Sequence, residues 1–221
     1  MGVNTQVYVG TLVDAFRAAA NASRAQGQRA YLRNQFAFFG LRAPERRQLQ
    51  SAHFPAKPEA ATPEFVEGYI RALWDREERE CQHSAVDFAI RQKLTDLALI
   101  RWMIMTKSWW DTVDLIATNL VSNAVASDPS KAEEMDRWIG DENFWIRRSA
   151  ILHQLKFKKK TDTRRLFEYC RRCGEEEEFF IQKAIGWALR EYAKTDAKAV
   201  KKFLASTKLS KLSVKEASRH F

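Results

Sequence analysis

The sequence predicts an all-α fold, built as an α-solenoid of stacked helix pairs. Three observations lead to this prediction: a composition that favours helices, apolar residues at helical spacing between helix start and stop signals, and a 35-residue repeat. Of the 221 residues, 45% are hydrophobic, and only eight are glycine and five are proline. That is enough apolar material for one sizeable core or one continuous run of repeats.

Helix start and stop signals follow one another along the chain. Thr62-Pro63 and Asp128-Pro129 each join a capping residue to a proline that suits the first helical position. Two further serines stand three residues before an acidic residue, the spacing of a capping box: Ser108 with Asp111, and Ser213 with Glu216. Helix ends are expected at Gly140 and Gly174.

Between these signals, apolar residues recur at helical spacing. Examples are Phe65, Tyr69, Ile70, Leu73 and Trp74, and farther on Leu97, Ile100, Ile104 and Met105. We expect about a dozen helices with short connections. No Pro-, Gly- or Ser-rich linker interrupts the pattern, so residues 1–221 are expected to form a single domain.

The repeat consists of two adjacent aromatic residues after a polar residue, at Ser108-Trp109-Trp110, Asn143-Phe144-Trp145 and Glu178-Phe179-Phe180. Its 35-residue period is that of a helix pair, which cannot bury its apolar face alone and stacks on its neighbours. Adjacent helical residues point about 100° apart, so we expect Trp109 to pack between repeats while Trp110 faces outward. The alternative is three unrelated aromatic pairs in the core.

Polar residues stand on the same helix faces as these aromatic residues. Trp110 and Asp114 are four residues apart and share a face. The second and third repeats would present Trp145, Arg148 and Leu152, and Phe180, Lys183 and Trp187. Stacked repeats would align these faces into a row of aromatic side chains with one acid and two bases.

The net charge of +9 is concentrated in one stretch of the chain. Residues 147–172 contain ten Lys and Arg against two acidic residues, a net charge of +8. Such a segment suits a phosphate backbone, although a membrane surface or an acidic protein would satisfy it too. The run from Lys156 to Lys160 could equally be a solvated face.

Several classes of protein are disfavoured by what the sequence lacks. There is no apolar run of 18 residues and no signal-like start, so we expect a cytoplasmic protein, associated with the nucleoid in a bacterium. Three cysteines are too few for a disulfide framework, and Cys170 and Cys173 are expected to be incidental helix residues. The absence of HExxH, P-loop, GxSxG and GxGxxG motifs argues against metallohydrolases, nucleotide-dependent enzymes and serine hydrolases.

The remaining candidate groups for chemistry are a carboxylate, indoles and guanidinium groups, which together stabilise positive charge. Cleavage of an N-glycosidic bond develops such a charge on the sugar. Asp114 would stabilise the sugar cation and orient water, Trp110 and Trp187 would cradle the nucleotide, and Arg148 would hold a phosphate. Structural roles are the alternative: a salt-bridged Asp114, and core positions for tryptophan, which we expect for Trp74, Trp102 and Trp138.

Over nearly its whole length the chain resembles the AlkD-type DNA alkylation repair glycosylases, which are HEAT-like repeat proteins. Four segments carry the resemblance: 41–47, 106–114, 150–156 and 179–194. It implies a solenoid of HEAT-like repeats with a basic concave DNA-binding cleft. It also implies that Asp114 is the catalytic aspartate, that Trp110 and Trp187 flank the lesion, and that Arg148 lies in the cleft.

The implied activity is that of a monofunctional glycosylase that removes cationic N3- and N7-alkylated purines, such as 3-methyladenine and 7-methylguanine, from duplex DNA. The resemblance implies no metal, cofactor or lyase activity, and a monomer suffices to bind one duplex. Residues expected to contact DNA are Tyr31, Lys107, Arg147, Lys156, Lys158, Lys159, Lys160, Lys183 and Arg190. Two alternatives stay open: a catalytically silent repeat protein that binds distorted DNA, and a solenoid that binds a partner protein.

Overall fold

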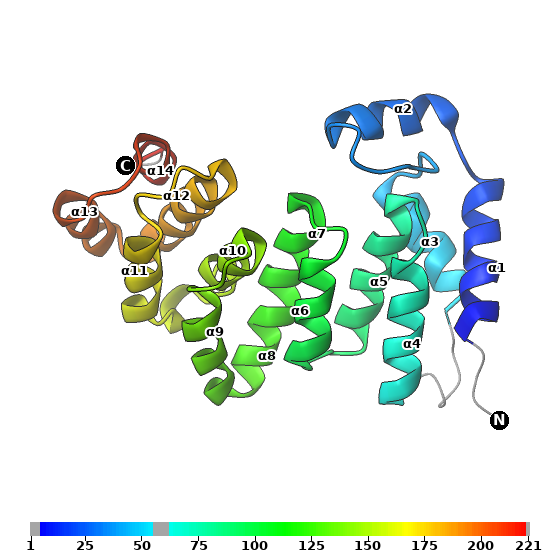
Figure 1. Cartoon of the computed structure of the whole chain (residues 1–221), viewed down its shortest axis with the longest axis horizontal. Coiled ribbons are helices and arrows are strands. Elements are labelled where there is room, and N and C mark those ends of the chain that lie inside the picture. Colours follow the sequence, from blue (N-terminus) through cyan, green and yellow to red (C-terminus); the bar gives the residue numbers. More distant parts are fainter. Residues whose placement is uncertain (1–4, 55–61, 220–221) are drawn as a thin grey trace. The chain divides into compact units, whose positions relative to one another are not determined.

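The computed structural model describes residues 5–54 and 62–219, and these residues are predominantly helical (Figure 1). An isolated bridge between Ala37 and Glu78 is the only β-type pairing among them. The all-α prediction is therefore confirmed. The chain divides into two compact units, residues 1–94 and 95–221, and each is described by itself. That the whole chain is a single domain stays a prediction.

In its described residues the first unit contains five helices, and four of them pack on one another. The five helices are α1 (Thr5–Ala18), α2 (Ala22–Tyr31), α3 (Ala43–Ala52), α4 (Pro63–Trp74) and α5 (Arg79–Arg91). Helix α4 packs against α1 and α5, and α3 packs against the same two helices. The predicted start of α4 is confirmed, because the Thr62 side chain accepts a hydrogen bond from the Phe65 amide. The apolar residues predicted from Phe65 to Trp74 are all buried.

Part of the segment that carries the resemblance near the start of the chain has a structural role. Arg46 is buried and donates to the Asp87 carboxylate at 2.7 Å, which joins α3 to α5. The buried carboxylate of Glu80 accepts hydrogen bonds from the amides of Phe39, Gly40 and Leu41 at 3.2, 2.9 and 3.1 Å. These bonds satisfy three backbone donors of a loop that would otherwise leave them buried without partners.

The second unit is built around helix α10 (Phe144–Leu152), which packs against helices that come before it and after it in the chain. Its elements are α6 (Leu97–Met105), α7 (Trp110–Leu115), a π-helical segment (Ile116–Val121), α8 (Ser122–Ser127), a 3-10 turn (Pro129–Lys131), α9 (Ala132–Trp138), α10 (Phe144–Leu152), a second 3-10 turn (Lys158–Lys160), α11 (Thr163–Arg172), α12 (Phe179–Ala193), α13 (Ala197–Ser206) and α14 (Lys211–Ala217). The neighbours of α10 include α7, α9, α11 and α12, and α12 in turn packs against α13 and α14. This layer-on-layer packing is that of a helical repeat solenoid.

The two predicted capping boxes are wrong. Helix α7 has Trp109 at its N-cap, and the Ser108 hydroxyl instead donates to the Ile104 carbonyl at 2.6 Å. Helix α14 is capped by Ser210, whose side chain accepts from the Ser213 amide at 3.1 Å. In contrast, the predicted cap at Asp128 is confirmed by its bond from the Ser130 amide at 3.1 Å.

The repeat is present, but its register differs from the one predicted. Helices α10 and α12 begin at Phe144 and Phe179, 35 residues apart, whereas α7 begins at Trp110, only 34 residues before α10. The aromatic pairs therefore do not occupy equivalent positions in all three helices. In the observed register Asp114 is equivalent to Arg148, and Arg148 to Lys183, each at the fifth position of its helix.

Close packing of α12 on α14 depends on Gly186. A Cβ atom added there would lie 2.3 Å from the Cβ of Glu216. We expect Gly186→Ala to lower the free energy of unfolding, because overpacking costs roughly 1–3 kcal/mol and exceeds the roughly 0.5–1 kcal/mol that alanine gains over glycine in a helix. Urea denaturation measures this change.

Gly27 provides the matched control, since it lies inside α2 and a Cβ atom there would meet nothing within 4 Å. Gly27→Ala should therefore stabilise the protein slightly. Equal stabilisation by both substitutions would show that α14 does not need the glycine.

Candidate functional site

The centre of the candidate site is an ion pair between equivalent positions of α7 and α10. Arg148 Nε lies 2.7 Å from Asp114 Oδ1, and Arg148 Nη2 lies 2.8 Å from Asp114 Oδ2, so the contact is bidentate. The side chains are 17% and 5% exposed for Asp114 and Arg148. Arg148 Nη1 also donates to the Phe180 carbonyl of α12. One guanidinium group thus joins three successive repeats and fixes the orientation of the carboxylate.

Two opposing effects act on the Asp114 carboxyl. Burial raises its pKa above the ordinary value of an aspartate, and the nearby charge of Asp111 adds to this. The hydrogen bonds and charge of Arg148 lower the pKa and offset part of the effect of burial. Arg148 is therefore the group that favours the ionised carboxylate in this environment.

This geometry differs from the role that we predicted for Arg148. The sequence suggested a phosphate contact, whereas the guanidinium is buried and directed at Asp114 and Phe180. The salt-bridged Asp114 that we considered as the structural alternative is thus present. Salt bridging and chemistry are compatible here, because Asp114 remains partly exposed while its partner is buried.

Aromatic side chains pack beside this ion pair. The Trp109 ring lies 6.0 Å from that of Trp145 and 5.4 Å from that of Phe180, between centroids, so the prediction that Trp109 packs between repeats is confirmed. The predicted row of outward aromatic residues is wrong at Trp145, which is buried in this cluster. Trp110 and Trp187 are both half-buried, and their place beside a damaged nucleotide stays a prediction.

The predicted DNA-contacting residues of the second unit fall into two groups. Three of them are held by acidic residues: Arg147 forms a bidentate pair with Glu176 at 2.6 and 3.1 Å, while Lys183 and Arg190 both contact Glu216. Arg147 is also bound to the carbonyls of residues 141 and 142, so it holds the loop before α10. These three side chains are not freely mobile surface cations.

The other group lies in the segments between helices, where Lys107 is half-buried and the four lysines between residues 156 and 160 are exposed. Lys158, Lys159 and Lys160 form an exposed 3-10 turn, and the Lys156 ammonium donates to Asn119 Oδ1 in the π-helical segment at 2.7 Å. Lys107 has a positive φ of 48° in the connection from α6 to α7. In the first unit, Tyr31 is the last residue of α2 and is 72% exposed. Contact of any of these residues with DNA stays a prediction.

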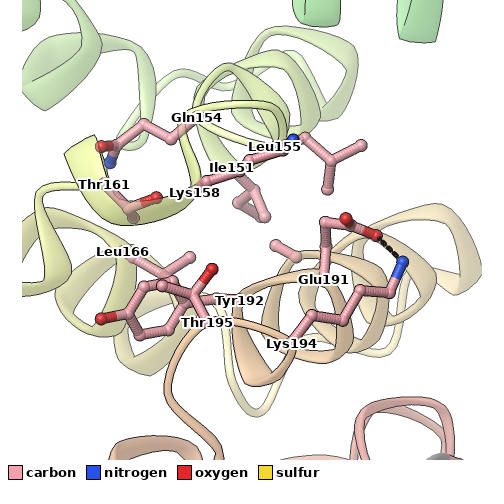
Figure 2. Close-up of a pocket in the computed structure, with 11 residues that line it drawn as sticks. Ile151, Gln154, Leu155, Lys158, Thr161, Leu166, Glu191, Tyr192, Lys194 and Thr195 are labelled. Carbon is pink, nitrogen blue, oxygen red and sulfur yellow. Dashed lines mark hydrogen bonds and ion pairs between the residues drawn. The ribbon is translucent and has the colours of Figure 1, made fainter.

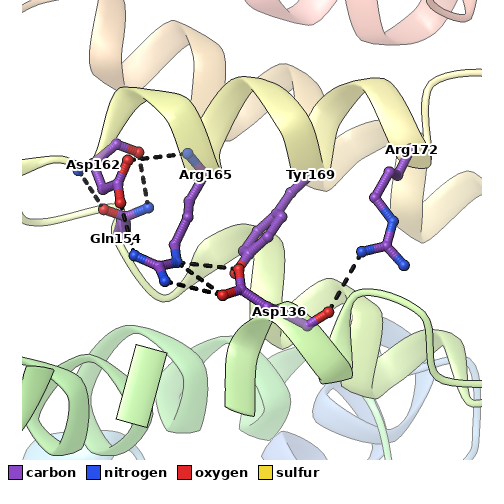
Figure 3. A network of polar contacts seen from close by, with 6 residues as sticks. All are labelled: Asp136, Gln154, Asp162, Arg165, Tyr169 and Arg172. Atoms are coloured by element: carbon purple, nitrogen blue, oxygen red, sulfur yellow. Dashed lines mark hydrogen bonds and ion pairs between the residues drawn. The ribbon is translucent and has the colours of Figure 1, made fainter. Parts of the chain in front are cut away.

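Not all of the charge in residues 147–172 is available to a partner. Figure 3 shows that Arg165 lies between two carboxylates, Asp136 of α9 at 2.9 Å and Asp162 of its own segment at 2.8 Å. The hydroxyl of Tyr169 donates to Asp136 Oδ1 at 2.6 Å. Its hydrogen bonds with Asp136 raise the pKa of Arg165. This network joins α9 to α11 and serves packing, so the basic segment is less positive toward solvent than its composition suggests.

A cavity of about 200 Å³ lies beside the ends of α10 and α12, and its walls are shown in Figure 2. It is lined by apolar side chains such as Ile151 and Leu166, together with Tyr192, Lys158 and the ion pair of Glu191 with Lys194. Asp114, Arg148, Trp110 and Trp187 are absent from its walls. A ligand in this cavity would therefore not contact the Asp114 carboxylate.

The cysteine residues are buried, as are most of the tryptophans that we expected in the core. Burial raises the pKa of the Cys173 thiol to about 12 and also raises that of Cys170, which fits incidental rather than reactive cysteines. Trp74 and Trp138 are buried as predicted, whereas Trp102 is half-buried.

Within the described residues, no three His, Cys, Asp or Glu side chains gather as a metal site would require. No described helix is both long and apolar enough for a membrane span.

The chain is similar to a known protein family and to two solved structures. A family model described as "DNA alkylation repair enzyme" matches residues 12–221. A solved structure described as a predicted DNA alkylation repair enzyme from Enterococcus faecalis is 33% identical, with a TM-score of 0.84, over 91% of this chain and 96% of that one. The Streptococcus mutans UA159 protein smu.31 is 17% identical, with a TM-score of 0.64, over 80% and 92%, which indicates a shared fold. Comparison with curated proteins finds no match.

Proposed function

The chain belongs to the DNA alkylation repair enzyme family, and from this premise we propose that it is a monofunctional DNA glycosylase. Its substrates would be cationic N3- and N7-alkylated purines, such as 3-methyladenine and 7-methylguanine, in duplex DNA. The observation that carries the proposal is the partly exposed Asp114 carboxylate, which Arg148 holds in a bidentate pair. A fixed carboxylate of this kind suits stabilisation of a developing cation.

In the proposed reaction the bond between C1′ and the purine nitrogen breaks, and its electron pair leaves with the base. An alkylated purine already carries a positive charge, so it departs as a neutral molecule without an acid. The sugar becomes oxocarbenium-like, and the Asp114 carboxylate stabilises this charge. Water then adds to C1′, while its proton passes to solvent through Asp114.

Trp110 and Trp187 would contact the damaged nucleotide. Indole faces attract cations through their quadrupole, and the attraction strengthens where water is excluded. Trp110 stands one helical turn before Asp114 and therefore on the same face of α7. We assign Arg148 to the orientation of Asp114 rather than to a phosphate, because its guanidinium is buried against that carboxylate.

Release of free base from a duplex that contains 7-methylguanine tests the activity. The protein should release 7-methylguanine faster than spontaneous depurination does, and an unmodified duplex should release no base. If the protein binds the duplex but release stays at the spontaneous rate, it is the catalytically silent DNA-binding protein. If the protein neither binds the duplex nor releases base, the result favours the hypothesis of a solenoid that binds a partner protein.

The salt dependence of DNA affinity tests the proposed phosphate contacts. The logarithm of the association constant should fall linearly with the logarithm of salt concentration, because bound phosphates release counterions. Replacing Lys158, Lys159 and Lys160 by Gln should make this slope shallower by roughly 1 for each lysine that contacts a phosphate.

A matched control replaces Lys198, Lys201 and Lys202, three exposed lysines of α13, by Gln. This variant has the same net charge as the first, so it separates local contacts from overall charge. Equal slopes for the two variants would show that the 3-10 turn is not a DNA contact.

A further inference from the structure

Glu216 of α14 is a buried carboxylate with three cationic partners. Its side chain is 4% exposed and lies 3.0 Å from Lys183 Nζ, 2.8 Å from Arg190 Nη1 and 2.9 Å from Arg219 Nη2. Arg190 Nη1 also lies 3.2 Å from the Glu216 carbonyl. The pKa of Glu216 lies below its ordinary value: burial acts to raise it, but the hydrogen bonds from Lys183 and Arg190 outweigh that effect. The carboxylate is therefore a stable anion among three cations.

The two partners on α12 stand on either side of Trp187. Lys183 is four residues before it and Arg190 three residues after it, so all three side chains share one face of the helix. Lys183 and Arg190 are seven residues apart, about 10 Å along the helix axis. They nevertheless reach the two oxygens of one carboxylate. Glu216 thus draws their charged ends together near Trp187.

The backbone contacts of α14 make this arrangement rigid. Gly186, the residue before Trp187, lets the Cβ of Glu216 approach α12 closely. One turn earlier on each helix, the Ser213 hydroxyl donates to the Gln182 carbonyl at 3.0 Å. The carboxylate is consequently fixed relative to the α12 backbone at Gly186, the residue before Trp187.

The cluster also keeps capacity for an anion. Three cations around one carboxylate leave a net charge of +2, and the Lys183 side chain is 35% exposed. Within the described part of the chain, Arg190 uses only Nη1 in its hydrogen bonds, so Nε and Nη2 keep donors for a further acceptor. A phosphodiester is an acceptor that matches two converging cations.

We propose that Glu216 is a positioning residue that holds Lys183 and Arg190 together beside Trp187, so that both contact a phosphodiester of the damaged strand and seat the nucleotide against the indole. This inference rests on the proposed glycosylase function. It differs from a purely structural role, because a buried ion pair that served packing alone could be replaced without consequence for the rate.

Glu216→Gln tests the proposal, because it keeps the shape of the side chain and removes its charge. The amide has no charge, and its NH2 group, which only donates, replaces one of the two oxygens that Lys183 and Arg190 contact, so one of the two cations loses its acceptor atom. We expect the single-turnover rate of 7-methylguanine release to fall roughly tenfold, while affinity for undamaged duplex stays equal or rises because the protein gains one positive charge. A loss of folding stability alone would leave the rate of the folded protein unchanged.

Glu175→Gln is the matched control. Glu175 pairs with Lys208 at 2.6 Å, and both side chains are exposed, so the substitution makes the same change in charge away from α12 and α14. It should leave the rate of release unchanged. Glu216→Asp, which keeps the charge on a shorter side chain, should recover part of the lost rate.

Two further variants keep the proposal testable if Glu216→Gln does not fold. Lys183→Gln and Arg190→Gln retain the carboxylate and remove what it positions, and each should slow release. Unchanged rates in both would overturn the proposal, as would a Glu216→Gln protein that releases base at the wild-type rate. If the wild-type protein releases no base, the proposed function itself fails and this inference fails with it.

Discussion

Asp114→Asn should lower the rate of 7-methylguanine release by two to three orders of magnitude. The amide preserves the size of the side chain but carries no charge to stabilise the sugar cation, and removing one group of this kind from an active site costs roughly 10²–10³ in rate. Affinity for undamaged duplex should change little, because Asp114 is held by Arg148 and would act on the transition state. Single-turnover release from a modified duplex measures the effect.

The control for this substitution is Asp14→Asn on α1. Asp14 pairs with Arg17 at 2.7 Å on the surface, so the chemical change is the same in an exposed pair. It should leave the rate unchanged. Full activity of Asp114→Asn would remove the carboxylate from the mechanism and would favour the structural role of the ion pair.

Arg148→Ala should have the largest effect on stability. Removing one partner of a buried pair leaves an uncompensated charge, and such losses cost about 3 kcal/mol of the free energy of unfolding. The destabilisation should depend on pH. Burial raises the pKa of Asp114, and the substitution removes the hydrogen bonds and the charge of Arg148 that lower it.

The sign follows from the proton balance. A carboxyl with a raised pKa in the folded protein binds more protons than in the unfolded chain, so stability falls as pH rises between the two pKa values. Arg148→Ala should therefore lose more stability at neutral pH than at acidic pH. The acid limb of the pH–rate profile should also move to higher pH, because catalysis needs the ionised form.

Urea denaturation at several pH values and a pH–rate profile measure both effects. Arg17→Ala breaks the exposed pair with Asp14 and should cost less than about 1 kcal/mol, with no pH shift in the rate. If Arg148→Ala behaves like this control, the pair does not hold the Asp114 carboxylate in its ionised state.

Local signals in the sequence predicted much of the fold. The helical spacing of Phe65, Tyr69 and Trp74 corresponds to the buried face of α4, and Thr62 caps that helix. Ser108 was misread because its hydroxyl has a competing acceptor, the Ile104 carbonyl, at the end of the preceding helix. A capping box read from residue spacing cannot take such a competitor into account.

The geometry of the candidate site depends on how α7 and α10 align with each other. The aromatic pairs in the sequence predicted an alignment that differs by one residue from the observed one. Aligning the aromatic pairs at 35 residues sets Asp114 opposite Ser149, whereas the helix starts set it opposite Arg148. A salt bridge of Asp114 was among the alternatives, but Arg148 was not foreseen as its partner, although both residues were singled out. Glu216 was missed as a site residue because its partners lie on α12, and Ser213 suggested a capping role for it instead.

The contacts of Arg148 affect local unfolding in the second unit. In a repeat protein each layer contacts only its neighbours, and terminal layers can fray independently of the middle. Arg148 binds a side chain on α7 and a backbone carbonyl on α12, so it ties both adjoining layers to its own. Fraying of α12 would withdraw one of the anchors that orient Asp114. The same contacts of Arg148 thus maintain both the local cooperativity of folding and the orientation of the Asp114 carboxylate.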